Sequence, residues 1–164
     1  MISPDDEAAV AAQLGREPRA IHAVGHRCPC GLPDVVTTEP RLPDGTPFPT
    51  TYYLTCPRAA SLIGTLEGVG RMKDMEARLA DDEELAAAYA AAHLAYLADR
   101  AALAEQVGQS VPEIEGVSAG GMPNRVKCLH VLAAHALAAG PGVNPLGDEV
   151  LDSLGAWWEP GPCA

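Results

Sequence analysis

The sequence predicts an α+β fold, in which a small three-stranded antiparallel sheet or hairpin lobe packs on a mainly helical body. One reason is that β-branched and alternating residues gather between residues 19 and 55. Another is that the chain after residue 57 consists largely of good helix formers, interrupted by glycine and proline. A chain of 164 residues can also bury one core of its own. We therefore expect a single domain, 1–164, with a helix-plus-strand lobe (1–56), a helical body (57–155) and a tail (156–164).

Cap and turn residues set the elements of the lobe. Ser3 followed by Pro4 is typical of a helix start, and Gly15 of a helix stop. The turn of the hairpin carries two thiols, in the segment Cys28-Pro29-Cys30-Gly31. The prolines that follow favour an extended, rather rigid loop. The expected elements are a helix between residues 3 and 15, a hairpin at 19–36, a loop at 40–50 and a third strand at 51–55.

Glycine and proline also divide the helical body. The longest run of helix formers should be the longest helix, and its expected core face consists of Leu85, Tyr89, Ala92, Tyr96 and Leu103. A further helix from Pro123 to Ala139 would place Cys128 on its inward stripe. The expected helices cover about 57–67, 71–80, 81–107, 123–139 and 144–155.

The charge of the chain argues against several kinds of partner. The net charge is −11 and the pI is about 4.7, whereas binding to nucleic acid or anionic lipid needs an excess of Lys and Arg. The alanine-rich run 85–98 falls short of the ~20 apolar residues that a membrane span requires. Asp5, Asp6 and Glu7 stand where a signal peptide would be basic. We therefore expect a cytoplasmic protein with reduced thiols, no membrane span and no nucleic-acid partner.

Four cysteines could meet in space and hold a metal ion. Cys28 and Cys30 share one turn, Cys56 lies where the third strand runs into a helix, and Cys128 lies on the predicted inward stripe. Zinc binds four thiolates at roughly 2.3 Å, often a short-spaced pair with ligands from separate elements. His26 could replace one thiol because it shares the strand face of Cys28. The leading hypothesis is a cysteine-ligated zinc protein.

Other roles of these cysteines stay open. The odd count of five prevents a complete set of intramolecular disulfides. The same four residues could hold an iron–sulfur cluster, and Cys28 with Cys30 could form a redox pair. The thiols could also be buried small side chains without a metal. Spacing alone does not choose between these possibilities.

A possible anion site precedes the same predicted helix. A glycine turn leads to the expected helix start, and two cations follow in its first turns, where backbone N–H groups and the helix dipole favour a phosphate or carboxylate. Its residues are Ser118, Gly120, Gly121, Arg125 and Lys127. The plainer explanation is a glycine turn beside solvated charges. The alternative function is an enzyme acting on an anionic, phosphorylated or carboxylate small molecule, with Cys128 as nucleophile or an open-site metal as Lewis acid.

Long stretches of the chain resemble one known family. They are QLGREPR (13–19), RCPCG (27–31), PRLPDGTPFPTTYYLTCP (40–57), SAGGMPNRVKCLH (118–130) and GPGVNPLGDE (140–149). Through them the chain resembles the actinobacterial family called domain of unknown function 501 over nearly its whole length. The family name implies no activity, and the resemblance supplies no catalytic residues.

Overall fold

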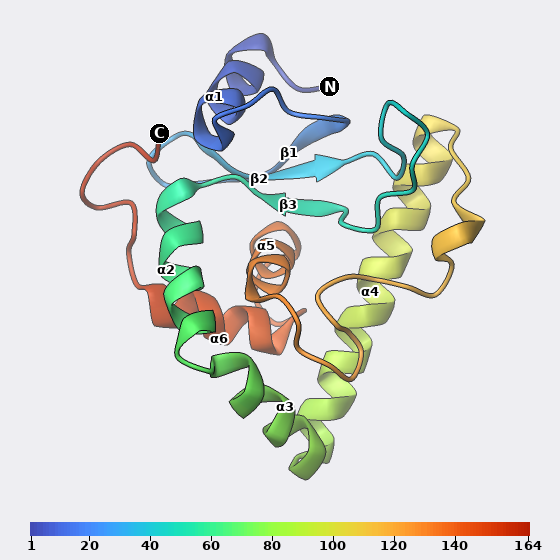
Figure 1. Ribbon diagram of the computed structural model, residues 1–164, viewed down its shortest axis with the longest axis vertical. Coiled ribbons are helices and arrows are strands. Elements are labelled where there is room, and N and C mark those ends of the chain that lie inside the picture. Colours follow the sequence, from blue (N-terminus) through green and yellow to red (C-terminus); the bar gives the residue numbers. More distant parts are fainter.

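A three-stranded antiparallel sheet lies across the molecule and separates one helix from the other five (Figure 1). In this computed structural model, which describes residues 1–164, the strands follow the order β1-β2-β3 and comprise Ile21–Arg27, Pro33–Thr38 and Tyr52–Leu54. Helix α1 (Pro4–Leu14) packs on one face of the sheet, and helix α5 (Leu129–Ala139) packs on the other. The predicted α+β class is confirmed.

The remaining helices surround α5. They are α2 (Pro57–Gly68), α3 (Arg71–Asp81), α4 (Glu83–Val107) and α6 (Pro145–Leu154), and a short 3-10 turn, η1 (Pro112–Ile114), lies in the loop after α4. In Figure 1, α2 and α4 stand on either side of α5, and α3 joins their lower ends. Helix α4 is the longest, as predicted. None of the helices combines the length and the apolar character that a membrane crossing needs.

The predicted helix caps are local features, and most of them form. The Ser3 side chain accepts from the Asp6 N–H at 3.2 Å, and Asn144 Oδ1 accepts from the Gly147 N–H at 3.0 Å. Helix α4 begins after Asp82, whose carboxylate accepts from the Leu85 N–H, so its cap lies one residue beyond the predicted Asp81. These side chains satisfy N–H groups that have no partner within their own helix.

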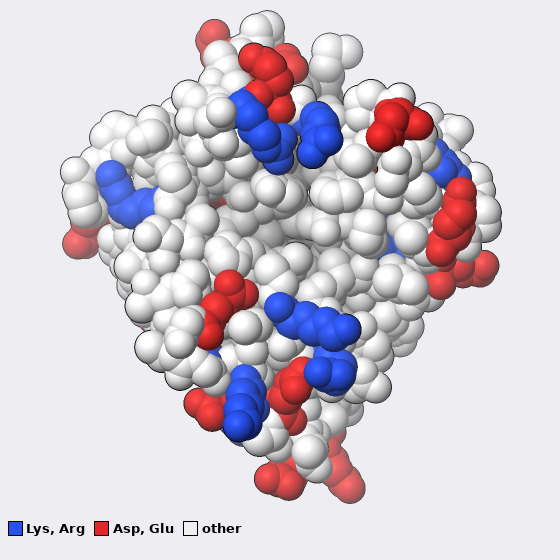
Figure 2. Space-filling view, in the orientation of Figure 1, with Lys and Arg blue, Asp and Glu red and all other residues white.

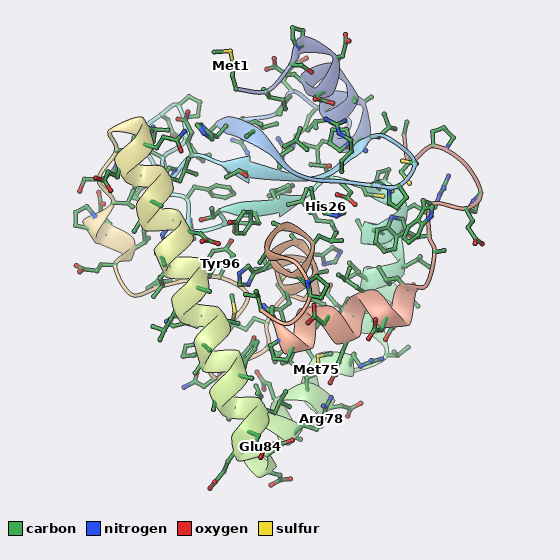
Figure 3. The ribbon with its side chains drawn as sticks, turned by 180° about the vertical axis from the view of Figure 1, so that it is seen from behind. Met1, His26, Met75, Arg78, Glu84 and Tyr96 are labelled. Atoms are coloured by element: carbon green, nitrogen blue, oxygen red, sulfur yellow. The ribbon has the colours of Figure 1, made fainter.

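Helix α5 forms the centre of the core. Its buried residues are Leu129, Leu132, Ala133, Ala134, His135 and Ala136, and a helix that is apolar on most sides belongs inside a domain. Tyr96 of α4 points toward α5, where its ring meets the His135 ring edge-on at 5.0 Å (Figure 3). The residues predicted for the core face of α4 are buried, except that Leu85 is only partly buried and packs against the core.

One predicted boundary is wrong, because α5 begins at Leu129 rather than at Pro123. The preceding segment folds back on itself: the Arg125 N–H donates to the Gly121 carbonyl, and the Lys127 N–H donates to the Gly120 carbonyl, both at 2.8 Å. Gly121 has φ +95°, and a Cβ there would lie 2.7 Å from the Arg125 carbonyl oxygen. This turn needs glycine and consumes N–H groups that could have extended the helix. Cys128 therefore stands at the N-cap of α5 instead of inside it.

The C-terminal tail packs into the fold. Trp157 and Cys163 are only 6% and 1% exposed. They form a small apolar cluster with Cys28, Cys56 and Ala59, separate from the main core. The tail thereby reaches the β1–β2 turn and the start of α2, far from its own neighbours in sequence.

Candidate metal centre

Three thiols from distant parts of the chain meet at the edge of the fold. Cys28 and Cys30 lie in the turn between β1 and β2, and Cys163 lies in the C-terminal tail. The Sγ atoms of Cys28 and Cys163 are 3.9 Å apart, and the three Sγ atoms all lie within 4.8 Å of one another. This group, called the thiol cluster below, could hold a metal ion, because sulfur is a preferred ligand of zinc and of iron–sulfur clusters.

Backbone hydrogen bonds shape the turn that carries two of these thiols. The Gly31 N–H donates to the Cys28 carbonyl at 2.8 Å, and the Cys28 N–H donates to the Leu32 carbonyl at 2.9 Å. The chain reverses within these few residues, so both thiols reach the same side of the turn. The Cys-x-Cys spacing, shorter than the common Cys-x2-Cys, therefore still brings Cys28 and Cys30 together.

Two polar side chains hold the tail against this turn. The guanidinium of Arg58 donates to three carbonyl oxygens of the tail at 2.8–3.2 Å, those of Trp157, Gly161 and Pro162. Gln13 Nε2 donates to the Cys163 carbonyl at 2.9 Å. Arg58 belongs to α2 and Gln13 to α1, so the position of Cys163 depends on both helices.

A fourth cysteine adjoins the thiol cluster. Cys56 is the N-cap of α2, where its Sγ accepts from the Ala59 N–H at 3.4 Å. It is fully buried in the same apolar cluster as Cys28 and Cys163. Its Sγ is outside the group whose donor atoms all lie within 4.8 Å of one another, so Cys56 stands beside that group.

Burial governs the ionisation of these thiols. It raises the pKa of Cys28 to about 11, and it raises the pKa of Cys163 as well, with the thiols of Cys30 and Cys56 adding to the effect. Burial also opposes ionisation of Cys30, but the N–H groups of Leu32 and Cys163 and the neighbouring thiols lower its pKa overall. Cys30 therefore ionises first, and a metal ion would have to displace protons from the other thiols.

The structure places two predicted ligands elsewhere. Cys128 is not part of the thiol cluster, because it stands at the N-cap of α5 and belongs to a second group of donors. His26 is occupied by Asp34, whose Oδ1 lies 2.7 Å from its Nδ1. Cys163 takes the place predicted for Cys128. The only sequence signal for Cys163 was that it is a thiol, since nothing in its local pattern predicts where the tail lies.

The second group consists of Glu67, Cys128 and His130, whose donor atoms also lie within 4.8 Å of one another. His130 Nδ1 is 3.1 Å from Glu67 Oε1, and its Nε2 donates to the Ala60 carbonyl at 3.0 Å. The Cys128 thiol, followed by the Glu67 carboxylate, raises the pKa of His130 to about 9. Burial opposes ionisation of Cys128, but His130 and the Val131 N–H lower its pKa overall.

Sequence reasoning missed two members of this second group. On the predicted helix 123–139, His130 would point away from Cys128. The later start of α5 frees Cys128 from helical geometry and lets both side chains meet Glu67. Glu67 itself lies near the end of α2, and no pattern in the sequence predicted that it meets Cys128 and His130.

The predicted anion site is largely filled by the chain's own groups. Glu76 Oε1 accepts from the Arg125 Nε and the Val126 N–H, both at 2.8 Å, and Glu67 Oε2 accepts from the Leu129 N–H at 2.9 Å. The backbone of Gly120 and Gly121 closes the turn already described. Ser118 Oγ pairs with His93 Nδ1 at 2.7 Å. Of the five predicted residues, only Lys127 offers a side-chain charge without an ion pair.

The fold and the thiol cluster define an α+β protein with a group of cysteines that could hold a metal ion. Residues 24–152 match the model of the family described as "Protein of unknown function (DUF501)", and the chain belongs to this family. The predicted resemblance to this family is thus confirmed over residues 24–152, a span that begins after the QLGREPR segment (13–19). No curated protein and no solved structure matches the chain. The matched span contains Cys28, Cys30, Cys56 and Cys128 and ends before Cys163.

Proposed function

We propose that this protein binds one structural zinc ion through Cys28, Cys30, Cys163 and Cys56. The observation that carries the proposal is the 3.9 Å separation of the Cys28 and Cys163 Sγ atoms. Zinc–sulfur bonds of about 2.3 Å at tetrahedral angles separate two sulfurs by about 3.8 Å. A disulfide would require about 2.05 Å, so the observed separation fits shared ligation of one ion much better.

The fourth ligand is Cys56. It contacts the cluster from the start of α2, and a rotation of its side chain toward the ion would break only its bond to the Ala59 N–H. Four thiolates leave no position for a substrate, which is the pattern of a structural site. The function of the ion is then to fasten the C-terminal tail to the β1–β2 turn and to α2.

Zinc is the proposed ion because a single zinc ion binds four thiolates and needs no inorganic sulfide. An iron–sulfur cluster on the same residues is the alternative metal, and a Cys-x-Cys redox pair is the alternative without a metal. A reducing compartment such as the cytoplasm would keep these thiols available as ligands. The three possibilities predict different metal content and different numbers of free thiols.

Elemental analysis of protein purified without a metal-affinity tag tests the proposal. The Cys163→Ser variant should contain one zinc ion per chain fewer than the wild type, and Ser110→Ala, on the exposed loop after α4, should lose none. Chelation should lower the Tm of the wild type by more than it lowers that of Cys163→Ser. Equal zinc content in wild type and Cys163→Ser would contradict the proposal. Finding iron with labile sulfide would show an iron–sulfur cluster in place of the zinc ion. Finding two fewer free thiols and no metal would show a disulfide in its place.

A further inference from the structure

We propose that Glu67, Cys128 and His130 form a second, open metal site, and that the cleft beside it binds a small anion at the free position of the ion. The two metal sites share no residue, so this inference does not depend on the thiol cluster. The group joins the end of α2 to the start of α5 and supplies three different donors, a carboxylate oxygen, a thiolate and an imidazole nitrogen. A zinc site that leaves one position open usually has three protein ligands, drawn from His, Cys and Asp or Glu.

Neighbouring backbone groups fix the orientation of two of the three ligands. His130 Nε2 donates to the Ala60 carbonyl at 3.0 Å, which leaves Nδ1 facing the other donors. Glu67 uses Oε2 to accept from the Leu129 N–H at 2.9 Å, which leaves Oε1 facing Nδ1. A metal-bound histidine commonly donates its second N–H to a carbonyl or carboxylate, and a metal-bound carboxylate is commonly hydrogen-bonded in the same way.

The spacing of the donors also suits an ion. His130 Nδ1 and Glu67 Oε1 are 3.1 Å apart. Bonds of about 2.0–2.1 Å from zinc to nitrogen and oxygen, at tetrahedral angles, separate the two donors by about 3.3 Å. Ligation therefore requires only a small outward movement. A second carboxylate capping the same turn, Glu76, is already occupied by Arg125 and Val126 and is not needed as a ligand.

The open side of the group faces a cleft. Cys128 and His130 line a cavity of about 550 Å³, together with side chains of β3 and its flanking residues such as Tyr52, Tyr53 and Thr55. Figure 2 shows this side of the molecule hollowed at its centre. The thiol cluster is mostly buried, whereas Glu67, Cys128 and His130 are each partly exposed. A ligand entering the cleft can therefore reach an ion held by the second group.

Positive side chains on both sides of the hollow favour an anionic ligand (Figure 2). Arg16 and Arg19 line a smaller pocket that shares Leu14 and Tyr53 with the cleft. Lys127 directly precedes Cys128, which lines the cleft. None of these three cations forms an ion pair, although the chain carries a net charge of −11. Cations that form no ion pair beside a cleft attract anions such as phosphate or carboxylate.

Metal content of matched variants tests the site. Cys128→Ser and His130→Gln should each contain one zinc ion per chain fewer than the wild type, and Cys163→Ser with Cys128→Ser should contain none. His22→Gln, a partly buried histidine of β1 outside both groups, should keep the wild-type content. If Cys163→Ser loses no metal while Cys128→Ser does, only the proposed function fails. Unchanged zinc in both Cys128→Ser and His130→Gln would overturn the second site.

Alkylation of the wild type gives a test that no variant can disturb by misfolding. Bound zinc should protect the Cys128 thiol from iodoacetamide, and chelation should speed its modification at least tenfold. Peptide mass analysis measures the rate of modification at Cys128. An equal rate before and after chelation would mean that no removable metal ion protects Cys128, which overturns the proposal.

The anion is tested on protein loaded with cobalt(II), whose visible spectrum reports ligands at the open position. Inorganic phosphate or acetate should change the spectrum of the wild type, and the comparison shows which type of anion binds more tightly. Lys127→Gln should weaken this binding by about fivefold, the upper size expected for one exposed charge, and Lys73→Gln on α3 should not weaken it. No spectral change with either anion at millimolar concentration would overturn the anion site.

Discussion

The Sγ atoms of Cys28 and Cys163 lie 3.9 Å apart, although 135 positions separate the two residues in the chain. This contact joins the tail to the first hairpin, and Arg58 and Gln13 hold the tail in the position that makes it possible. The proposed zinc site is therefore assembled only when both ends of the chain have folded.

Replacing Arg58 by methionine should release the tail. The variant leaves three carbonyl oxygens of the tail without their charged donor, and hydrogen bonds to charged groups contribute roughly 1.5–3 kcal/mol each. We expect the free energy of unfolding to fall by about 2–3 kcal/mol in urea denaturation, and zinc release to a chelator to become faster. Arg71→Met, which loses one bond to Ser153, is the control and should change little. Zinc release at the wild-type rate would show that Arg58 does not support the site.

Gly147→Ala should disrupt the contact between α5 and α6. A Cβ at Gly147 would overlap the Leu132 carbonyl oxygen and meet the Ala136 Cβ at 2.8 Å, so the helices would have to move apart. Overpacking of this kind costs about 3 kcal/mol, measured as the free energy of unfolding. Gly64→Ala is the matched control, because its Cβ would meet nothing within 4 Å and alanine favours the α2 helix by roughly 0.5–1 kcal/mol. Equal stability of the two variants would contradict the close helix packing.

His135 should make the fold sensitive to mild acid. It is fully buried, its Nδ1 accepts from Asn144 Nδ2 at 3.1 Å, and its Nε2 has no partner. Burial lowers its pKa, so the unfolded chain binds a proton more readily than the folded one. The contribution of neutral His135 to the free energy of unfolding is therefore complete above the unfolded pKa of about 6.5. It is lost as the pH falls below that value, and the free energy of unfolding then decreases by up to about 1.4 kcal/mol per pH unit.

The pH dependence of the free energy of unfolding of His135→Phe checks the direction of this effect. Between pH 7 and pH 5 the variant should lose less stability than the wild type, because phenylalanine cannot bind a proton and can keep the stacking on Tyr52. Since carboxylates titrate in both proteins, the difference between the two curves is the measured quantity. Parallel curves for wild type and His135→Phe would show that His135 does not carry the effect.

Arg100→Met should loosen the loop between α4 and α5. Arg100 is only 4% exposed and donates to the carbonyl oxygens of Pro49, Ile114 and Val117. Without it these three carbonyl oxygens lose the donor that the buried guanidinium provides, and we expect a loss of about 2–4 kcal/mol in unfolding free energy with faster amide exchange at 108–121. Arg78→Met, which breaks an exposed pair with Glu149, should cost less than about 1 kcal/mol. Unchanged exchange in Arg100→Met would contradict the proposed role of Arg100.

The elements that the sequence predicted correctly depend on neighbouring residues. Ser3 and Asn144 cap their helices through bonds that span three residues, and β1 and β2 pair as antiparallel neighbours across the predicted hairpin turn. The turn of Cys28 and Cys30 is equally local. The fold class, most helices and half of the proposed thiol site could therefore be inferred from short segments.

The sequence by itself thus determined the α+β class, most of the helix limits and the pairing of Cys28 with Cys30. Only the tertiary structure decided that Cys163 joins them and that Cys128 instead meets Glu67 and His130. The physical reason is that these contacts depend on hydrogen bonds between distant segments. Arg58 positions the tail, and the carboxylates of α2 and α3 take the N–H groups around residues 125–129, so α5 starts later than its local sequence suggests.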